Sequence, residues 1–217
     1  MKSQDILLLL KLVSLYRQEQ RELQLDLEEE AWRQELNGYV SEPGWQGWEL
    51  YEDIASPPVV SARDRYSVRN LEAVTGISKS EISASLKRSI SVGLAVLDRK
   101  SYYPRANCRA LKGFIEFGIK YVFPAKPGAI VRGIPTAFAA PIMAGKLMTA
   151  GETINVWPDP YGKEKGQSVE PLFKSVPKAV KQDPQLYKLL ALVDAIRLGN
   201  PRESQLAVKL LEDELPL

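Results

Sequence analysis

The chain has 217 residues, enough for one sizeable domain or two small ones, and it contains no histidine and a single cysteine. These absences exclude Ser-His-Asp and Cys-His nucleophile systems, histidine-metal sites, zinc fingers and an intrachain disulfide. A hydrophobic content of 45% and a charged content of 26% are typical of a soluble globular protein. Because no apolar run comes near the roughly 18 residues of a membrane span, we expect a cytoplasmic protein with no membrane partner.

The net charge of +2 is the sum of two blocks of opposite sign. Residues 17–53 hold three basic residues against eleven acids, a net −8, whereas residues 67–112 hold nine basic residues against three acids, a net +6. A basic block attracts polyanions such as nucleic acid, although two solvated faces of opposite sign explain the same pattern. The choice between these two readings therefore depends on the motif inside the basic block.

The N-terminal part of the chain predicts helices followed by a long connector. Ser3 is placed to cap a helix with an apolar stripe over residues 6–13. Residues 21–36 favour a second helix, with a short strand around 23–27 as the alternative. Residues 38–62 contain three prolines and read as a connector. Its aromatic residues either form a partner or ligand surface or fold onto the core, and both readings stay open: Trp45, Trp48 and Tyr51.

Residues 67–97 predict two helices joined by a tight turn and followed by a hairpin. Ser67 caps a short helix to about Thr75, Gly76 makes the turn, and Ser78 caps a second helix that ends at Gly93. The inward side chains of this second helix are expected to be those that recur every four residues: Ile82, Leu86 and Ile90.

A hairpin is expected directly after the second helix. Residues 94–97 read as a short strand and residues 98–101 as a charged turn. Asn107 is placed to cap a further helix through Phe117, and residues 119–123 look like a strand.

The run from Ser67 to Leu94 resembles the helix-turn-helix of winged-helix bacterial transcription regulators, the MarR-like group among others. The matching residues are Leu71, Val74, Gly76, Ile77, Ser78, Ile82, Leu86, Gly93 and Leu94. The resemblance implies sequence-specific binding of double-stranded DNA and transcriptional regulation, as a homodimer because such proteins usually read two half-sites. Two features depart from the pattern: Glu72 stands where a small residue is usual, and an acidic, Trp-containing insertion at about residues 17–62 lengthens the connector.

The candidate DNA-contacting side chains lie on the second helix and at the hairpin tip. Small serines and an alanine let a helix enter the major groove, where serine hydroxyls reach bases or phosphates and a methyl group meets thymine. Lysine and arginine suit phosphates or guanine. The expected set is Ser78, Lys79, Ser80, Ser83, Ala84, Lys87 and Arg88, with Arg99 and Lys100 reaching a neighbouring groove or backbone from the hairpin.

Residues 119–217 predict a Pro-rich segment followed by helices. Asp183 or Pro184 opens a helix that Gly199 stops, and Asn200 caps another with Pro201 in its first position. The apolar stripe 186–196 is first of all core and, as a second reading, a dimer interface. Asp194 and Arg197 favour a surface ion pair over one buried in an interface with Arg202. Short segments here look like the C-terminal part of a poorly characterised group of bacterial winged-helix proteins: 121–125, 132–136, 156–160 and 190–197.

We therefore expect a mainly α protein with a small β-hairpin wing (α+β), a winged helix-turn-helix domain over 1–118 and a helical appendage over 119–217 that serves dimerisation or partner binding. No acid-base or nucleophile set is assembled, so we expect no enzyme, no catalytic residue, no metal and no cofactor. Cys108 reads as an inert, partly buried small side chain. The alternative function is a winged-helix adaptor or antitoxin-like protein that acts through a protein partner.

Overall fold

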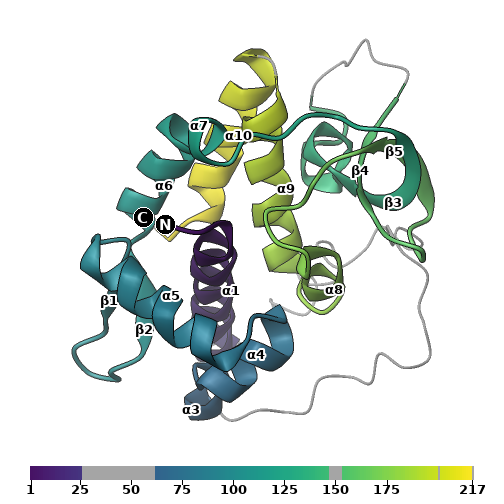
Figure 1. The fold of residues 1–217 in the computed structure, drawn as a ribbon. Coiled ribbons are helices and arrows are strands. Elements are labelled where there is room, and N and C mark those ends of the chain that lie inside the picture. The colour runs from purple at the N-terminus through teal and green to yellow at the C-terminus, as the bar shows by residue number, and fades with distance from the viewer. Residues whose placement is uncertain (26–61, 147–152, 200, 217) are drawn as a thin grey trace.

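The computed structural model describes residues 1–25, 62–146, 153–199 and 201–216, and Figure 1 shows their arrangement. This part of the chain is mainly helical, with a two-stranded antiparallel hairpin and a separate three-stranded sheet. The α+β class expected from the sequence is confirmed at this level. The hairpin and the sheet lie on opposite sides of the molecule (Figure 1). None of the helices in the described ranges is long and apolar enough to cross a membrane.

The centre of the molecule is α1 (Ser3–Leu25). Its side chains from Gln4 to Leu15 are buried all round the helix. A helix that is apolar on every side has to be covered on every side. Its neighbours are α4 and α5, strand β2 and helix α9, whose bounds follow below. The helix continues unbroken to Leu25, so the strand alternative for residues 23–25 is wrong. The remainder of the acidic segment, including Trp45, Trp48 and Tyr51, lies outside the described residues.

The two helices predicted after residue 66 are present as α4 (Val68–Thr75) and α5 (Lys79–Ser91), preceded by one turn of helix, α3 (Ala62–Arg65). Ser67 caps α4, since its hydroxyl accepts a bond from the Asn70 N–H at 3.2 Å. Gly76 ends α4 with φ of 67°, in the left-handed region that favours glycine. Ser78 occupies the N-cap position of α5 without a side-chain cap bond.

The inward face of α5 differs from the predicted stripe. Ile82, Ser85 and Ser89 are buried, whereas Ile90 is 40% exposed. Steps of four residues advance the direction by about 400° on a helix, so the stripe turns by roughly 80° between Ile82 and Ile90. The prediction that Ile90 anchors the helix is therefore wrong, and the small serines let α5 lie close to α1.

The predicted hairpin is formed by β1 (Ala95–Leu97) and β2 (Pro104–Ala106), which pair antiparallel. Asn107 then caps α6 (Cys108–Phe117) by accepting a bond from the Ala110 N–H at 3.2 Å. The next segment, expected as a strand, is one helical turn, α7 (Ile119–Val122). Ile119 is fully buried and α7 packs against α9, so core packing overrides the strand-like composition of this segment.

The Pro-rich region contains a sheet that the sequence did not indicate. Strand β3 (Ile130–Thr136) pairs antiparallel with both β4 (Asn155–Pro158) and β5 (Glu164–Ser168), and β4 pairs parallel with β5, so that the three strands close on themselves. Two short 3₁₀ turns, Ala137–Ala139 and Pro141–Met143, follow β3. Gly133 is required at the closure, because a Cβ there would lie 2.1 Å from the Trp157 carbonyl oxygen.

The C-terminal helices are α8 (Val176–Val180), α9 (Pro184–Leu198) and α10 (Pro201–Glu214). Asp183 caps α9 by accepting the Leu186 N–H at 2.9 Å, as predicted, and its carboxylate also forms a buried ion pair with Lys11 of α1 at 2.8 Å. The apolar stripe of α9 is buried within the single chain, so its reading as core is confirmed and it is not free to form a dimer interface.

The pair between Asp194 and Arg197 is buried, with side chains 2% and 4% exposed, so the prediction of a surface pair is wrong. The carboxylate also accepts bonds from Trp157 Nε1 at 2.6 Å and Thr136 Oγ1 at 3.2 Å. Arg197 Nε donates to the Phe123 carbonyl at 2.8 Å. This network joins α9 to β3 and β4 of the three-stranded sheet. The predicted segments 1–118 and 119–217 share one hydrophobic core, since α1 packs against α9.

Candidate nucleic-acid interface

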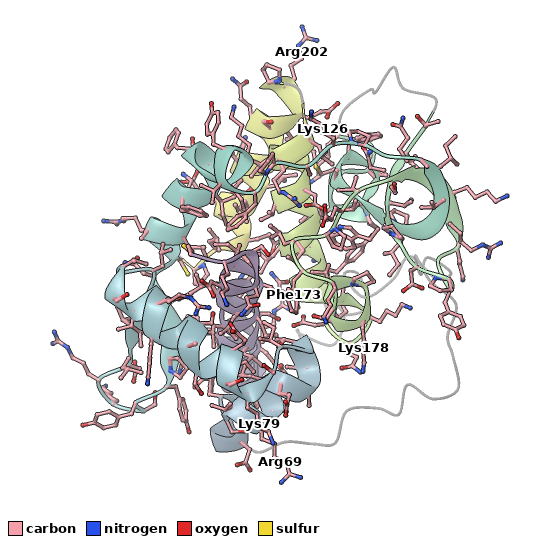
Figure 2. The ribbon with its side chains drawn as sticks, in the orientation of Figure 1. Arg69, Lys79, Lys126, Phe173, Lys178 and Arg202 are labelled. Atoms are coloured by element: carbon pink, nitrogen blue, oxygen red, sulfur yellow. The ribbon has the colours of Figure 1, made fainter. Side chains whose placement is uncertain are left out.

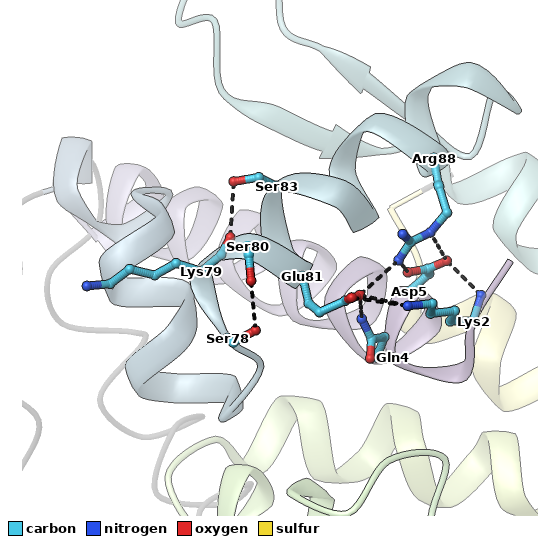
Figure 3. A network of polar contacts seen from close by, with 9 residues as sticks. All are labelled: Lys2, Gln4, Asp5, Ser78, Lys79, Ser80, Glu81, Ser83 and Arg88. Carbon is cyan, nitrogen blue, oxygen red and sulfur yellow. Dashed lines mark hydrogen bonds and ion pairs between the residues drawn. The ribbon is translucent and has the colours of Figure 1, made fainter.

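The side chains predicted to contact DNA on α5 are mostly at the surface. Ser78, Lys79, Ser80, Ser83 and Lys87 are exposed, and Ala84 is half-buried. The Ser78 and Ser80 hydroxyls lie 3.3 Å apart, and Ser83 Oγ donates to the Lys79 carbonyl at 3.1 Å (Figure 3). Lys79 Nζ is 3.5 Å from the Glu72 carboxylate, and the two side chains are 60% and 40% exposed. Because an exposed ion pair is weak, Lys79 can exchange Glu72 for another anion.

The acid on α5 is directed towards the start of α1 (Figure 3). Glu81 accepts bonds from Lys2 Nζ at 3.1 Å and from Gln4 Nε2 at 2.5 Å, and Arg88 lies 3.6 Å away. The Lys2 hydrogen bond is the main cause that lowers the pKa of Glu81. The carboxylate is therefore compensated within the protein, and its charge is turned away from the serine-bearing face of α5.

Arg88 is also engaged within the protein. Its Nε and NH2 donate to the two carboxylate oxygens of Asp5 at 3.0 and 2.7 Å (Figure 3). Asp5 is 0% exposed, and the Lys2 N–H donates to it at 2.8 Å. Such a two-bond contact to a buried carboxylate holds a guanidinium in one orientation. Arg88 thus joins α5 to α1. Because its guanidinium is already bound to Asp5, we remove Arg88 from the side chains expected to contact DNA.

Burial and charge act in opposite directions on Asp5. Desolvation would raise its pKa, but the hydrogen bonds from Arg88 and Lys2 and the positive charge of Arg88 together lower the pKa below its ordinary value. The same contact raises the pKa of Arg88. Both groups are therefore charged at neutral pH.

Arg99 and Lys100 are exposed at the tip of the hairpin, as predicted. Asp98 fixes this turn, because its Oδ1 accepts from the backbone N–H groups of Lys100 and Ser101 at 2.9 and 2.7 Å. The Ser101 contacts are the largest cause lowering the pKa of Asp98. The two basic side chains are thus carried on an ordered turn.

Arg105 on β2 is a residue whose role the sequence did not reveal. Its guanidinium carbon lies 4.8 and 4.7 Å from the ring centroids of Tyr16 and Tyr66, and NH1 pairs with Glu19 at 2.6 Å. These contacts join the hairpin to α1. No local spacing could have indicated them, since Tyr66 is 39 residues away in the chain and Tyr16 and Glu19 are more than eighty residues away.

Several basic residues of the segment 67–112 form ion pairs within the protein, so fewer of them are left to bind an anion than the sequence suggests. Arg88 and Arg105 are paired internally, and Lys112 forms an ion pair with Glu212 at 2.9 Å. The basic residues of this block with no ion pair to the described part of the chain are Arg69, Lys87, Arg99, Lys100 and Arg109.

A cavity of about 290 Å³ lies between α1, the hairpin and the start of α6. Its lining includes Leu12, Val13, Ala106 and Cys108. Burial raises the pKa of the Cys108 thiol to about 11, so the thiol is neutral and unreactive at physiological pH. Within the described residues, no cluster of three carboxylate or cysteine side chains is gathered for a metal ion.

A comparison of the chain with protein-family models, with characterised proteins and with solved structures finds no match.

Proposed function

We propose that the protein is a cytoplasmic winged helix-turn-helix regulator that binds double-stranded DNA through α5 and the β1–β2 hairpin, as a homodimer. The observation that carries this proposal is the sorting of charge on α5. Its one acid, Glu81, is turned towards α1, while Lys79 and Lys87 remain at the surface beside small polar side chains. A helix with small side chains, whose single acid is paired with Lys2 and Gln4 of the protein itself, is suited to the major groove.

The residues proposed to contact DNA fall into two groups. Ser80, Ser83 and Ala84 supply base-edge contacts from α5, and Ser78 and Lys79 contact the phosphate backbone beside the start of the helix. Lys87 on α5 and Arg99 and Lys100 on the hairpin add phosphate contacts. Arg88 acts indirectly, because it sets the angle of α5 on α1.

The test is selection of bound sequences from a pool of random duplexes, followed by titration of the selected duplex at several salt concentrations. A two-fold-related sequence is expected, and Lys87→Ala should lower the magnitude of the salt slope by about 0.9, the value for one phosphate contact. Arg109→Ala on α6 is the matched control, since it also removes an exposed basic side chain that has no ion pair to the described part of the chain. An unchanged slope in Lys87→Ala would contradict the groove assignment.

A second candidate is an adaptor that acts through a protein partner. The observation that favours it is a group of exposed hydrophobic side chains where α6 meets α7, formed by Phe117, Tyr121 and Val122, which are 71%, 73% and 49% exposed. Exposed apolar side chains grouped in this way mark interaction surfaces. The homodimer can use the same patch. Absence of duplex binding at low salt, together with a monomer in sedimentation, would favour the adaptor.

A further inference from the structure

The short helix α8, from the Pro-rich part of the chain, is attached to the turn between α4 and α5. Ser175, which precedes α8, donates a hydrogen bond from its hydroxyl to the Thr75 carbonyl at the end of α4. A Cβ at Gly76 would lie 2.8 Å from Ser175 Cβ, so glycine permits this close approach as well as the left-handed turn. The position of α8 beside the turn is therefore specified by direct contact.

Apolar packing against α4 and α9 also holds α8 in place. Its apolar side chains are buried, and the helix packs against both α4 and α9. The buried set is Val176, Ala179 and Val180. Because this packing holds α8 in place, the side chains on its exposed face start from a defined position relative to the start of α5.

Lysines are the charged side chains that this segment presents. Lys174 and Lys178 are exposed and have no ion pair within the described ranges, whereas Lys181 pairs with Asp159 at 2.8 Å. No acid occurs between residues 171 and 182. Figure 2 shows Lys178 on the same lower part of the molecule as Lys79 and Arg69. The charge of Lys181 is thus compensated by Asp159, whereas Lys174 and Lys178 can attract anions near the helix-turn-helix.

We propose that Lys174 and Lys178 form a second phosphate-contacting element, which binds the DNA backbone beside the groove entered by α5. This inference rests on the proposed function. It assigns a role to the Pro-rich segment: the segment positions two basic side chains outside the helix-turn-helix, and these add affinity without reading bases.

The experiment compares duplex binding by the wild type and by Lys174→Ala/Lys178→Ala over a range of salt concentrations. Each lost phosphate contact lowers the magnitude of the salt slope by about 0.9, so the double variant should lose about 1.8. The matched control is Lys163→Ala/Lys165→Ala, which removes the same charge from exposed positions around β5. The control should keep the wild-type slope, and the thermal unfolding of all three proteins should coincide.

The outcomes separate this inference from the proposed function. If the wild type binds duplex and the α8 variant keeps its slope, the α8 contact is wrong and the proposed function stands. If both double variants lose the same slope, net charge alone explains the effect and the α8 contact is again wrong. A wild type that does not bind duplex at low salt overturns both. Amine labelling gives a second readout, since bound duplex should protect Lys174 and Lys178 more than Lys163 and Lys165.

Discussion

Lys87 and Arg88 are adjacent basic residues with different structural roles. Lys87 is exposed, whereas Arg88 binds both oxygens of the fully buried Asp5. Removing one partner of a buried pair leaves an uncompensated charge, so Arg88→Ala should lower the free energy of unfolding by about 3 kcal/mol. Lys87→Ala should change it by less than about 0.5 kcal/mol. Urea denaturation measures both, and equal stabilities for the two variants would contradict the role given to Arg88.

Asp5 also predicts a dependence of stability on pH. Desolvation raises its pKa, but the contacts with Arg88 and Lys2 lower the pKa by more than desolvation raises it. The folded protein therefore has a lower pKa for this group than the unfolded chain, whose value is about 3.9. The stabilisation is therefore fully present above that value and is lost as pH falls through the lower, folded pKa. The difference in unfolding free energy between wild type and Asp5→Asn should shrink as the pH falls below about 4. A difference that stays constant over this range would show that Asp5 does not titrate in this way.

Gly76 and Gly93 provide a matched pair of left-handed glycines. Their φ values are 67° and 77°, but a Cβ meets Ser175 only at Gly76 and finds nothing within 4 Å at Gly93. Gly93→Ala should cost about 1 kcal/mol of stability for backbone conformation, and Gly76→Ala about 2–3 kcal/mol because overlap with Ser175 is added. Thermal unfolding of the two variants compares them directly. Equal losses would mean that α8 moves away freely.

At the scale of elements, the features that could be predicted were those specified by neighbouring residues. The helix caps at Ser67, Asn107 and Asp183 depend on residues three positions later, and all three were found. The closed sheet could not be predicted, since Gly133 pairs with residues more than twenty positions away and the prolines suggested irregular structure. Ile119 was assigned to a strand because its burial against α9 is not visible locally.

Arg105 is a main polar link between the hairpin and α1, beside apolar packing that includes the buried Ala95. Arg105 contacts the rings of Tyr16 and Tyr66 and forms an ion pair with Glu19. Lysine cannot reproduce the planar stacking, so Arg105→Lys should loosen the hairpin while leaving α6 ordered. Amide hydrogen exchange should accelerate in residues 95–106 and stay unchanged in residues 109–117. Equal acceleration in both segments would instead indicate a global loss of stability.

For the molecule as a whole, the order of the elements proposed to bind DNA could be predicted, but the internal ion pairs of their basic side chains could not. The helix–turn–helix–hairpin order follows from local signals, and the exposure of Lys79, Lys87 and Arg99 agrees with it. The internal use of Arg88 and Arg105 requires partners on α1, which is far away in sequence. A count of charges along a chain cannot separate basic residues that face solvent from those that join elements.

The central position of α1 makes the two halves of the chain dependent on one another. Residues 1–118 supply α1, but α9 covers one of its faces, and Asp183 is the partner of buried Lys11 and Ser14. A fragment of residues 1–118 would expose that face and leave a buried lysine without its acid. We therefore expect the fragment to lack a dispersed amide spectrum, whereas the full chain unfolds in one transition that coincides for all probes. A fragment that folds cooperatively alone would show that residues 1–118 are an independent domain, against which α9 packs without stabilising it.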